Sequence, residues 1–140
     1  MPVVVDASVV LAWLLPDEHS DEARSLIHRG VRERIRAPSL LLAEVANALR
    51  TAERRGRLRP ALRRALLDDF LSLPMALAPV SSSAVLRADE LAARHSLTVY
   101  DAGYLELAVS SGSVLATFDE ALKCAAAAEG LPLAYDDATR

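Results

Sequence analysis

Cysteine, histidine and glycine are scarce in this chain of 140 residues, which contains one, three and five of them. The single thiol, Cys124, can form neither an internal disulfide nor a zinc site built from several cysteines, so we expect a cytoplasmic protein. The three histidines share no spacing typical of metal ligands, and zinc is disfavoured for the same reason. The chemistry of this chain is therefore expected to rest on oxygen-bearing side chains.

Long apolar runs and an excess of positive charge are also missing. No segment is long enough to span a bilayer, and the apolar N-terminus is interrupted by Asp6 and preceded by no basic stretch, so we expect neither a membrane segment nor a targeting sequence. The net charge of −3 argues against binding of nucleic acid through overall charge. With 52% hydrophobic residues, the chain is expected to form one compact domain over residues 1–135, followed by a polar tail at 136–140.

Short apolar segments alternate with helical segments along the chain. This alternation predicts an α/β fold with three layers, in which a mostly parallel central sheet is covered by helices on both faces. Two helices around Gly56 are expected to form a protruding helical hairpin, and Gly30 is expected to end an earlier helix. Strands are predicted at 3–5, 34–37, 76–80, 113–117 and 131–135, and helices at 8–15, 17–29, 39–55, 60–72, 84–95, 98–110 and 119–129.

The first strand delivers a carboxylate to its C-terminal end. Three valines run directly into Asp6, and small residues that can start a helix follow it. In open parallel sheets, ligands bind in the crevice outside the carboxyl ends of the strands. Asp6 therefore lies where a functional site is expected.

Glu44 and Asn47 are the only polar residues between Ser39 and Arg50. The helix that carries them is apolar nearly all round, as expected of a helix packed on a sheet and on a partner helix. At a spacing of three the two side chains share one face, where a carboxylate needs a partner or a cation. The competing interpretation is a glutamate that reaches solvent or pairs with an arginine.

Asp101 and Asp119 both lie at expected helix starts. Thr98 and Asp101 fit a capping pattern, and Asp119 fits an ordinary N-cap, so each acid has a purely structural explanation. Asp119, however, follows Thr117 at the end of a strand, on the edge where Asp6 is expected. Four acids from separate segments at one edge predict a shared site.

Four motifs follow one another in the order Val-Val-Asp6-Ala-Ser8, Glu44-x-x-Asn47, Val-Tyr-Asp101-Ala-x-Tyr-Leu and Leu-Ala-Thr117-x-Asp119. Over nearly the whole chain this order resembles the PIN-domain family, and in particular the VapC toxins of bacterial toxin–antitoxin pairs. Gly103 is one departure, because alanine is more usual there, and it should weaken the helix without touching an acid.

The resemblance implies a metal-dependent endoribonuclease that forms a homodimer and is neutralised by a cognate VapB-type antitoxin. It places Asp6, Glu44, Asp101 and Asp119 at the acidic catalytic and metal-binding positions. Ser8, Asn47 and Thr117 are implied as supporting polar groups. Oxygen ligands without histidine or cysteine suit Mg²⁺ or Mn²⁺, and carboxylates so close together are expected to raise at least one pKa.

Seven of the sixteen basic residues gather around the turn of the predicted hairpin. RNA carries dense negative charge, so an acidic protein needs a local basic surface to hold it. Contact with an antitoxin and a solvated face with local ion pairs are the other interpretations. The candidates for contact with RNA or antitoxin are Arg50, Arg54, Arg55 and Arg57.

Other classes of protein fit less well. A phosphoacceptor receiver domain calls for paired acids after the first strand and a late strand-end lysine, whereas the single lysine, Lys123, falls within a helix. A nucleotide binder needs a glycine-rich turn after the first strand, and a haloacid-dehalogenase-like phosphatase needs a second aspartate in place of Ser8. The main alternative is a PIN-like binding or regulatory module with little or no nuclease turnover.

Overall fold

The structure is a computed structural model that describes residues 1–18 and 20–134. Within these ranges four parallel strands form one sheet in the order β3-β2-β1-β4. Val3 pairs with Ile35 on one side and with Val114 on the other, so β1 lies in the interior of the sheet. The strands are β1 (Val3–Val5), β2 (Ile35–Pro38), β3 (Met75–Ala78) and β4 (Val114–Ala116).

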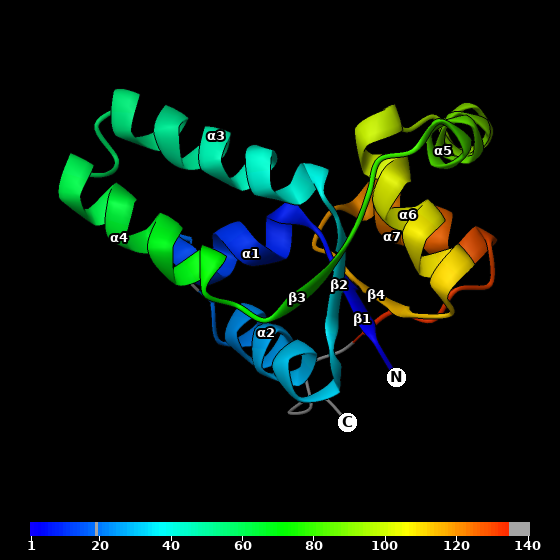
Figure 1. Cartoon of the computed structure of the whole chain (residues 1–140), viewed down its shortest axis with the longest axis horizontal. Helices are drawn as coiled ribbons and strands as arrows, with labels where there is room; N and C mark the ends of the chain where they lie inside the picture. The colour runs from blue at the N-terminus through cyan, green and yellow to red at the C-terminus, as the bar shows by residue number, and fades with distance from the viewer. Residues whose placement is uncertain (19, 135–140) are drawn as a thin grey trace.

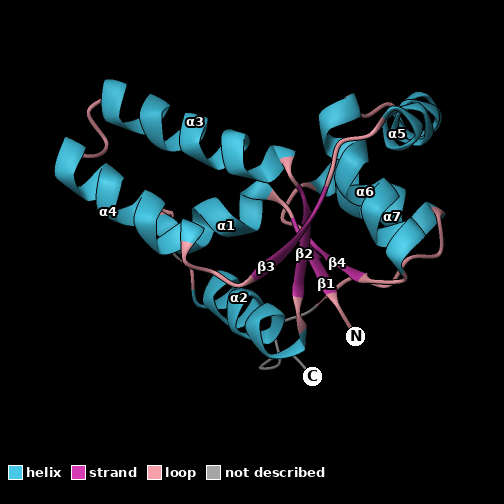
Figure 2. Cartoon of the chain, in the orientation of Figure 1, coloured by secondary structure: helices cyan, strands magenta, loops and turns pink. Residues whose placement is uncertain are grey.

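Helices cover both faces of the sheet, which confirms the three-layer α/β/α prediction (Figure 1). One side carries α1 (Ala7–Leu14), α2 (Asp21–Glu33), α3 (Leu40–Arg54) and α4 (Pro60–Leu71). The other side carries α5 (Ser82–His95), α6 (Val99–Ser111) and α7 (Glu120–Ala128). The helices α3 and α4 form a hairpin that projects away from the sheet, as Figure 2 also shows.

The core is built on β1 and on α6. The three valines of β1 are at most 1% exposed, because the strand is flanked by two neighbours and covered by helices on both faces. Tyr104 and Leu105 of α6 are equally buried, and α6 packs on β1, β2 and β4. Burial of β-branched and aromatic side chains on both faces of a parallel sheet is the main stabilising contribution in such a fold.

Several predicted element boundaries are wrong, and α2 differs at both ends, since it begins at Asp21 and not at residue 17. Gly30 lies inside α2, which continues to Glu33, and a Cβ at residue 30 would lie 2.7 Å from Cγ1 of Ile35. The glycine therefore permits close contact between helix and strand and does not end the helix. The predicted last strand is reduced to one bridge between Leu115 and Leu133. Tyr135 and the predicted tail lie outside the described residues.

No helix in the described ranges is both long enough and apolar enough to cross a membrane.

Candidate functional site

The site lies at the carboxyl edge of the sheet, where β1 and β4 end side by side. Val5 is in register with Ala116, and the Asp6 amide donates a hydrogen bond to the Ala116 carbonyl at 3.2 Å. The residues that follow the two strands are therefore brought together, although they are more than one hundred positions apart in sequence. Asp6 and Thr117 are both buried there, each 6% exposed.

Asp6 accepts hydrogen bonds on both carboxylate oxygens. Its Oδ1 accepts from the Ser8 hydroxyl at 2.6 Å and from the Val9 amide at 3.2 Å, so it also caps α1. Its Oδ2 accepts from the Thr117 hydroxyl. Three donors on one buried carboxylate hold it in a single orientation.

The hydroxyls of Ser8 and Thr117 are oriented by the loop after β4. Ser8 Oγ accepts from the Phe118 amide at 2.9 Å, and Thr117 Oγ1 accepts from the Asp119 amide at 3.0 Å. Because each hydroxyl has one hydrogen, and its oxygen already accepts from the backbone, that hydrogen is directed to Asp6. Both hydroxyls therefore donate to the Asp6 carboxylate.

Glu44 enters the site from α3 and is held by Tyr104 of α6. The Tyr104 hydroxyl donates to Glu44 Oε1 at 2.9 Å. Asn47, by contrast, is exposed, because α3 leaves the sheet as part of the hairpin and keeps a solvent-facing side. The prediction of a helix buried nearly all round is wrong, and Asn47 does not lie in a buried pair with Glu44.

Thr98 and Asp119 cap the helices α6 and α7 with their side chains, as their positions predicted. The Asp101 amide donates to the Thr98 hydroxyl at 3.0 Å, which caps α6. Asp119 caps α7, since its Oδ1 accepts from the Leu122 amide at 2.8 Å. These caps do not remove the two carboxylates from the site, because Asp101 interacts electrostatically with Asp6, Glu44 and Asp119.

Burial and mutual repulsion raise the pKa of three site carboxyls. Burial raises the pKa of Asp6, against the opposing effect of its hydrogen bonds, and Asp101 adds a smaller repulsion. Burial also raises the pKa of Glu44, with repulsion from Asp101 and Asp6. The pKa of Asp101 is raised by burial and then by Asp119. The site therefore holds more negative charge than it stabilises by itself.

The donor atoms suit a hard divalent cation, although no three of them converge. Among the described residues, no group of three or more His, Cys, Asp or Glu side chains is arranged to hold a metal ion. The carboxylates nevertheless repel one another in pairs, and their oxygens are of the kind that Mg²⁺ and Mn²⁺ prefer. Mg²⁺ is commonly held by one or two carboxylates, with water and substrate phosphate completing its shell. The site fits that mode of binding.

The arginines of the hairpin are largely engaged in ion pairs. Arg57 binds Asp17 through two hydrogen bonds of 2.9 Å and Glu18 through a third, which ties the loop after α3 to the loop after α1. Arg63 joins the two helices of the hairpin through Glu53 at 2.8 Å. Arg50 lies 3.7 Å from Glu53, and Arg54 donates to Thr51. Of the four contact candidates, only Arg55 has no side-chain partner within the described residues.

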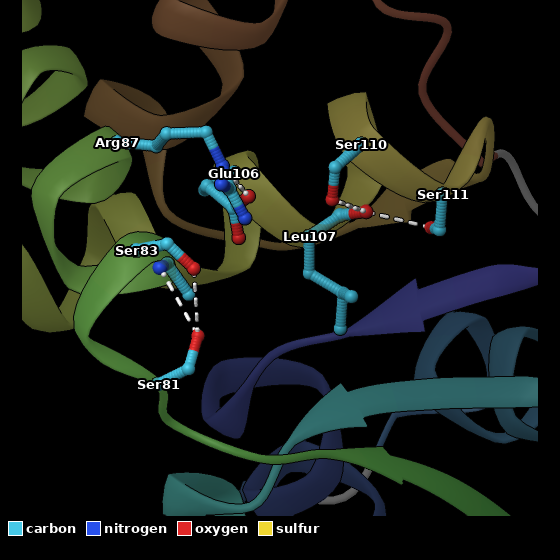
Figure 3. A network of polar contacts seen from close by, with 8 residues as sticks. Ser81, Ser83, Arg87, Glu106, Leu107, Ser110 and Ser111 are labelled. Atoms are coloured by element: carbon cyan, nitrogen blue, oxygen red, sulfur yellow. Dashed lines mark hydrogen bonds and ion pairs between the residues drawn. The ribbon is translucent and has the colours of Figure 1, made fainter.

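An apolar groove of about 380 Å³ adjoins the site between β3, α5 and α6. Val80 and Tyr100 line it and project from the surface, with exposed fractions of 56% and 65%. Figure 3 shows the polar contacts beside it, where Arg87 donates to Glu106 at 2.8 Å. Because that pair satisfies the groove's buried carboxylate, the remaining wall is chiefly apolar.

Tyr104 is the site residue to which sequence reasoning assigned no role. It forms part of the motif Val-Tyr-Asp101-Ala-x-Tyr-Leu, but an aromatic residue in an apolar helix is most simply explained as a residue of the hydrophobic core. The available signal was its spacing of three from Asp101, which places both on one side of α6. Its partner, Glu44, is 60 positions away, so no local pattern could indicate the hydrogen bond.

The chain matches the family model described as PIN domain over residues 3–128. It is 37% identical to Ribonuclease VapC3 of Pyrobaculum aerophilum over 123 residues, which covers 87% of this chain and 92% of that protein. It is also 37% identical to Ribonuclease VapC3 of Mycobacterium tuberculosis over 120 residues, with coverage of 86% and 84%.

Solved structures share the fold. The crystal structure of PAE2754 from Pyrobaculum aerophilum matches with a TM-score of 0.70 and 29% identity over 89% of this chain and 79% of that one. VapBC2 from Rickettsia felis, solved with a promoter DNA fragment, contains a chain that matches with a TM-score of 0.69 and 17% identity over 96% of this chain and 98% of that one. VapC20 of Mycobacterium tuberculosis, described as a toxin that cleaves the sarcin–ricin loop, matches at 0.67 with 18% identity, covering 95% and 98%.

Proposed function

The chain belongs to the PIN-domain family, and on this premise we propose that it is a VapC-type endoribonuclease toxin that hydrolyses RNA phosphodiester bonds with Mg²⁺ or Mn²⁺. The observation that carries the proposal is the set of mutually repelling carboxylates at the carboxyl edge of the sheet. Asp6, Glu44, Asp101 and Asp119 come from four separate segments, and burial and repulsion raise the pKa of the first three. Such an excess of negative charge suits a site that binds a cation.

We assign the roles of ligand and orienting group to these four carboxylates. Asp6 is the most rigid, since three donors fix both of its oxygens, and it is best suited to be a principal ligand together with Asp101. Glu44 and Asp119 serve as further ligands or as groups that orient the attacking water. When bound, the cation supplies acidification of a water molecule and offsets the charge that develops on the phosphate. Ser8 and Thr117 keep Asp6 in place, and Asn47 remains a proposed supporting group at the exposed rim.

RNA and a VapB-type antitoxin are the proposed partners. The named relatives are ribonucleases, and one structural neighbour is a VapBC assembly. Arg55 at the turn of the hairpin is the candidate best placed for a new contact, because it is exposed. Arg50, Arg54 and Arg57 already have side-chain partners, although each guanidinium keeps further N–H donors for a second contact.

A second copy of this chain is the proposed occupant of the apolar groove. The hollow and the projecting side chains Val80 and Tyr100 lie on one surface, so a twofold axis can bring each projection against the hollow of the other copy. An exposed apolar surface of this kind typically marks a protein interface. The proposed homodimer would place the two acidic sites near its interface, because Tyr100 directly precedes Asp101.

Cleavage of RNA by the purified protein tests the proposed activity. We expect turnover with Mg²⁺ or Mn²⁺, loss of turnover with a chelator, and a decrease of about 100-fold or more for Asp6→Asn, since even outer-shell changes at metal sites reduce activity by 10- to 100-fold. Asp68→Asn, an exposed acid on α4, is the matched control and should cleave normally. Turnover that survives both chelator and Asp6→Asn would overturn the proposal, and RNA binding without turnover would favour a binding module.

A further inference from the structure

We infer that Tyr104 is a positioning residue, whose hydroxyl holds the Glu44 carboxylate toward the other acids so that a divalent cation can be bound. The inference rests on the proposed function, because it concerns how the same site is prepared for its cation. Its basis is the 2.9 Å hydrogen bond that the Tyr104 hydroxyl donates to Glu44 Oε1.

Glu44 has little else to hold it. Within the described residues, this is the only hydrogen bond or ion pair of its side chain. A glutamate side chain has three rotatable bonds, and Glu44 is only partly buried. Repulsion from Asp101 and Asp6 favours rotamers that turn the carboxylate away from the site. The Tyr104 hydroxyl is a neutral donor that opposes this rotation without contributing a charge of its own.

Tyr104 is itself firmly placed. It is 1% exposed, and it is among the largest fully buried side chains of the described residues. Its ring is fixed by the core, and a fixed ring fixes the position of its hydroxyl oxygen. Rigid donors of this kind are effective in orienting a ligand, because little conformational freedom is lost when the hydrogen bond forms.

The hydrogen bond also joins two parts of the site. Asp101 and Tyr104 are three positions apart on α6, about one helical turn, whereas Glu44 comes from α3. One rigid helix therefore presents a carboxylate and, one turn later, the donor that holds the carboxylate of another helix. Loss of the hydroxyl should leave Asp101 in place and release Glu44.

Tyr104→Phe tests the inference, because it removes the hydroxyl and keeps the ring. We expect Mn²⁺ affinity of the RNA-free protein, measured by calorimetry, to fall by about 10-fold or more. RNA turnover at limiting Mn²⁺ should fall in parallel and recover at high Mn²⁺. The matched control is Ser111→Ala, which removes a hydroxyl that donates to the Leu107 carbonyl at the other end of the same helix, and its Mn²⁺ affinity should equal that of the wild type.

A double-mutant cycle separates positioning from a structural role. If Tyr104 acts through Glu44, adding Tyr104→Phe to Glu44→Ala should leave Mn²⁺ affinity unchanged. Unchanged affinity in the single variant, or an equal further loss in the Glu44→Ala background, would overturn the inference. The two proposals fail in different ways. A wild-type protein that binds Mn²⁺ but cleaves no RNA would overturn only the proposed ribonuclease activity. A wild type that cleaves RNA while Tyr104→Phe binds Mn²⁺ normally would overturn only the role of Tyr104.

Discussion

Three of the four site carboxylates also belong to helix starts. Asp6 caps α1 and Asp119 caps α7, while Asp101 lies in the first turn of α6. A helix start favours negative charge through its free amides and its dipole. The same side chains therefore stabilise the helix starts and form the acidic site. Asparagine is the substitution that best keeps the cap while removing the charge.

Glu44 differs, because it caps no helix and its charge is disfavoured by its surroundings. Its pKa is raised above the ordinary value of 4.5. The folded protein therefore binds the Glu44 proton more tightly than the unfolded chain does. The stabilisation that comes from this tighter proton binding is complete below pH 4.5 and is lost as the pH rises through the raised pKa of Glu44.

Glu44→Gln should consequently stabilise the metal-free protein at neutral pH relative to the wild type, and much less at acidic pH. Glutamine keeps an acceptor for the Tyr104 hydroxyl and carries no charge. Urea unfolding in the presence of a chelator at pH 4 and pH 7 measures the difference. Glu90→Gln, an exposed glutamate on α5, is the control. An equal effect of Glu44→Gln at both pH values would refute the expectation.

At this scale the sequence predicts the strand-end residues well, whereas it places Asn47 wrongly and misses Tyr104, both of them on helices. Asp6, Thr117 and Asp119 follow strands, and parallel strands must end at a common edge, so their proximity follows from local pattern and topology. The surroundings of Glu44 depend on how far α3 extends beyond the sheet. No periodicity in α3 encodes that distance, which is why Asn47 was expected in a buried position.

Two glycines within helices illustrate opposite uses of the same residue at the scale of the element. A Cβ on Gly30 would lie 2.7 Å from Ile35 Cγ1, whereas a Cβ on Gly103 would have no such neighbour within 4 Å. Glycine in a helix interior is less favourable than alanine by about 1 kcal/mol. Gly30 therefore permits contact between α2 and β2, and nothing in the packing of α6 requires Gly103.

Alanine at these two positions should change stability in opposite directions. Gly103→Ala should raise the free energy of unfolding by about 1 kcal/mol. Gly30→Ala should lower it by about 1–3 kcal/mol, because overpacking against Ile35 outweighs the better helix propensity. Chemical denaturation measures both values, and each variant serves as the control for the other. Stabilisation by Gly30→Ala would show that the helix can move away from the strand at little cost.

Element types follow from the sequence, while some boundaries do not. Serine, threonine or aspartate caps mark the starts of α5, α6 and α7, and such caps have a local cause that a sequence reveals. The start of α2 is predicted at residue 17, whereas its cap is Ser20. The end of α2 depends on its contact with β2. The last predicted strand depends on how far the chain around Leu133 can pair with β4 beyond the one bridge to Leu115. Both are decided by packing between elements, which local pattern does not contain.

The proposed homodimer concerns the molecule as a whole. Val80→Glu puts a charge on a residue that lines the apolar groove and is 56% exposed. Burying that charge between two copies without a partner is strongly unfavourable. Light scattering after size exclusion should therefore show a dimer for the wild type and a monomer for this variant.

Leu62→Glu provides the control for the dimer experiment. Leu62 is 41% exposed on α4, in the hairpin on the side of the sheet opposite α5 and α6 (Figure 1). This variant should remain dimeric. A monomeric wild type, or dissociation by both substitutions alike, would remove the groove as the interface.

The acidic site combines Asp6, from near one end of the chain, with Thr117, from near the other. Their separation determines when the site can form during synthesis. The two residues are 111 positions apart. The pairing of β1 with β4 and the hydrogen bond to Asp6 Oδ2 both require the later segment. During synthesis, β1 leaves the ribosome long before β4 is translated. A nascent chain shorter than this span carries Asp6 without the hydroxyl that fixes it. The acidic site therefore cannot assemble before β4 and Thr117 have been translated.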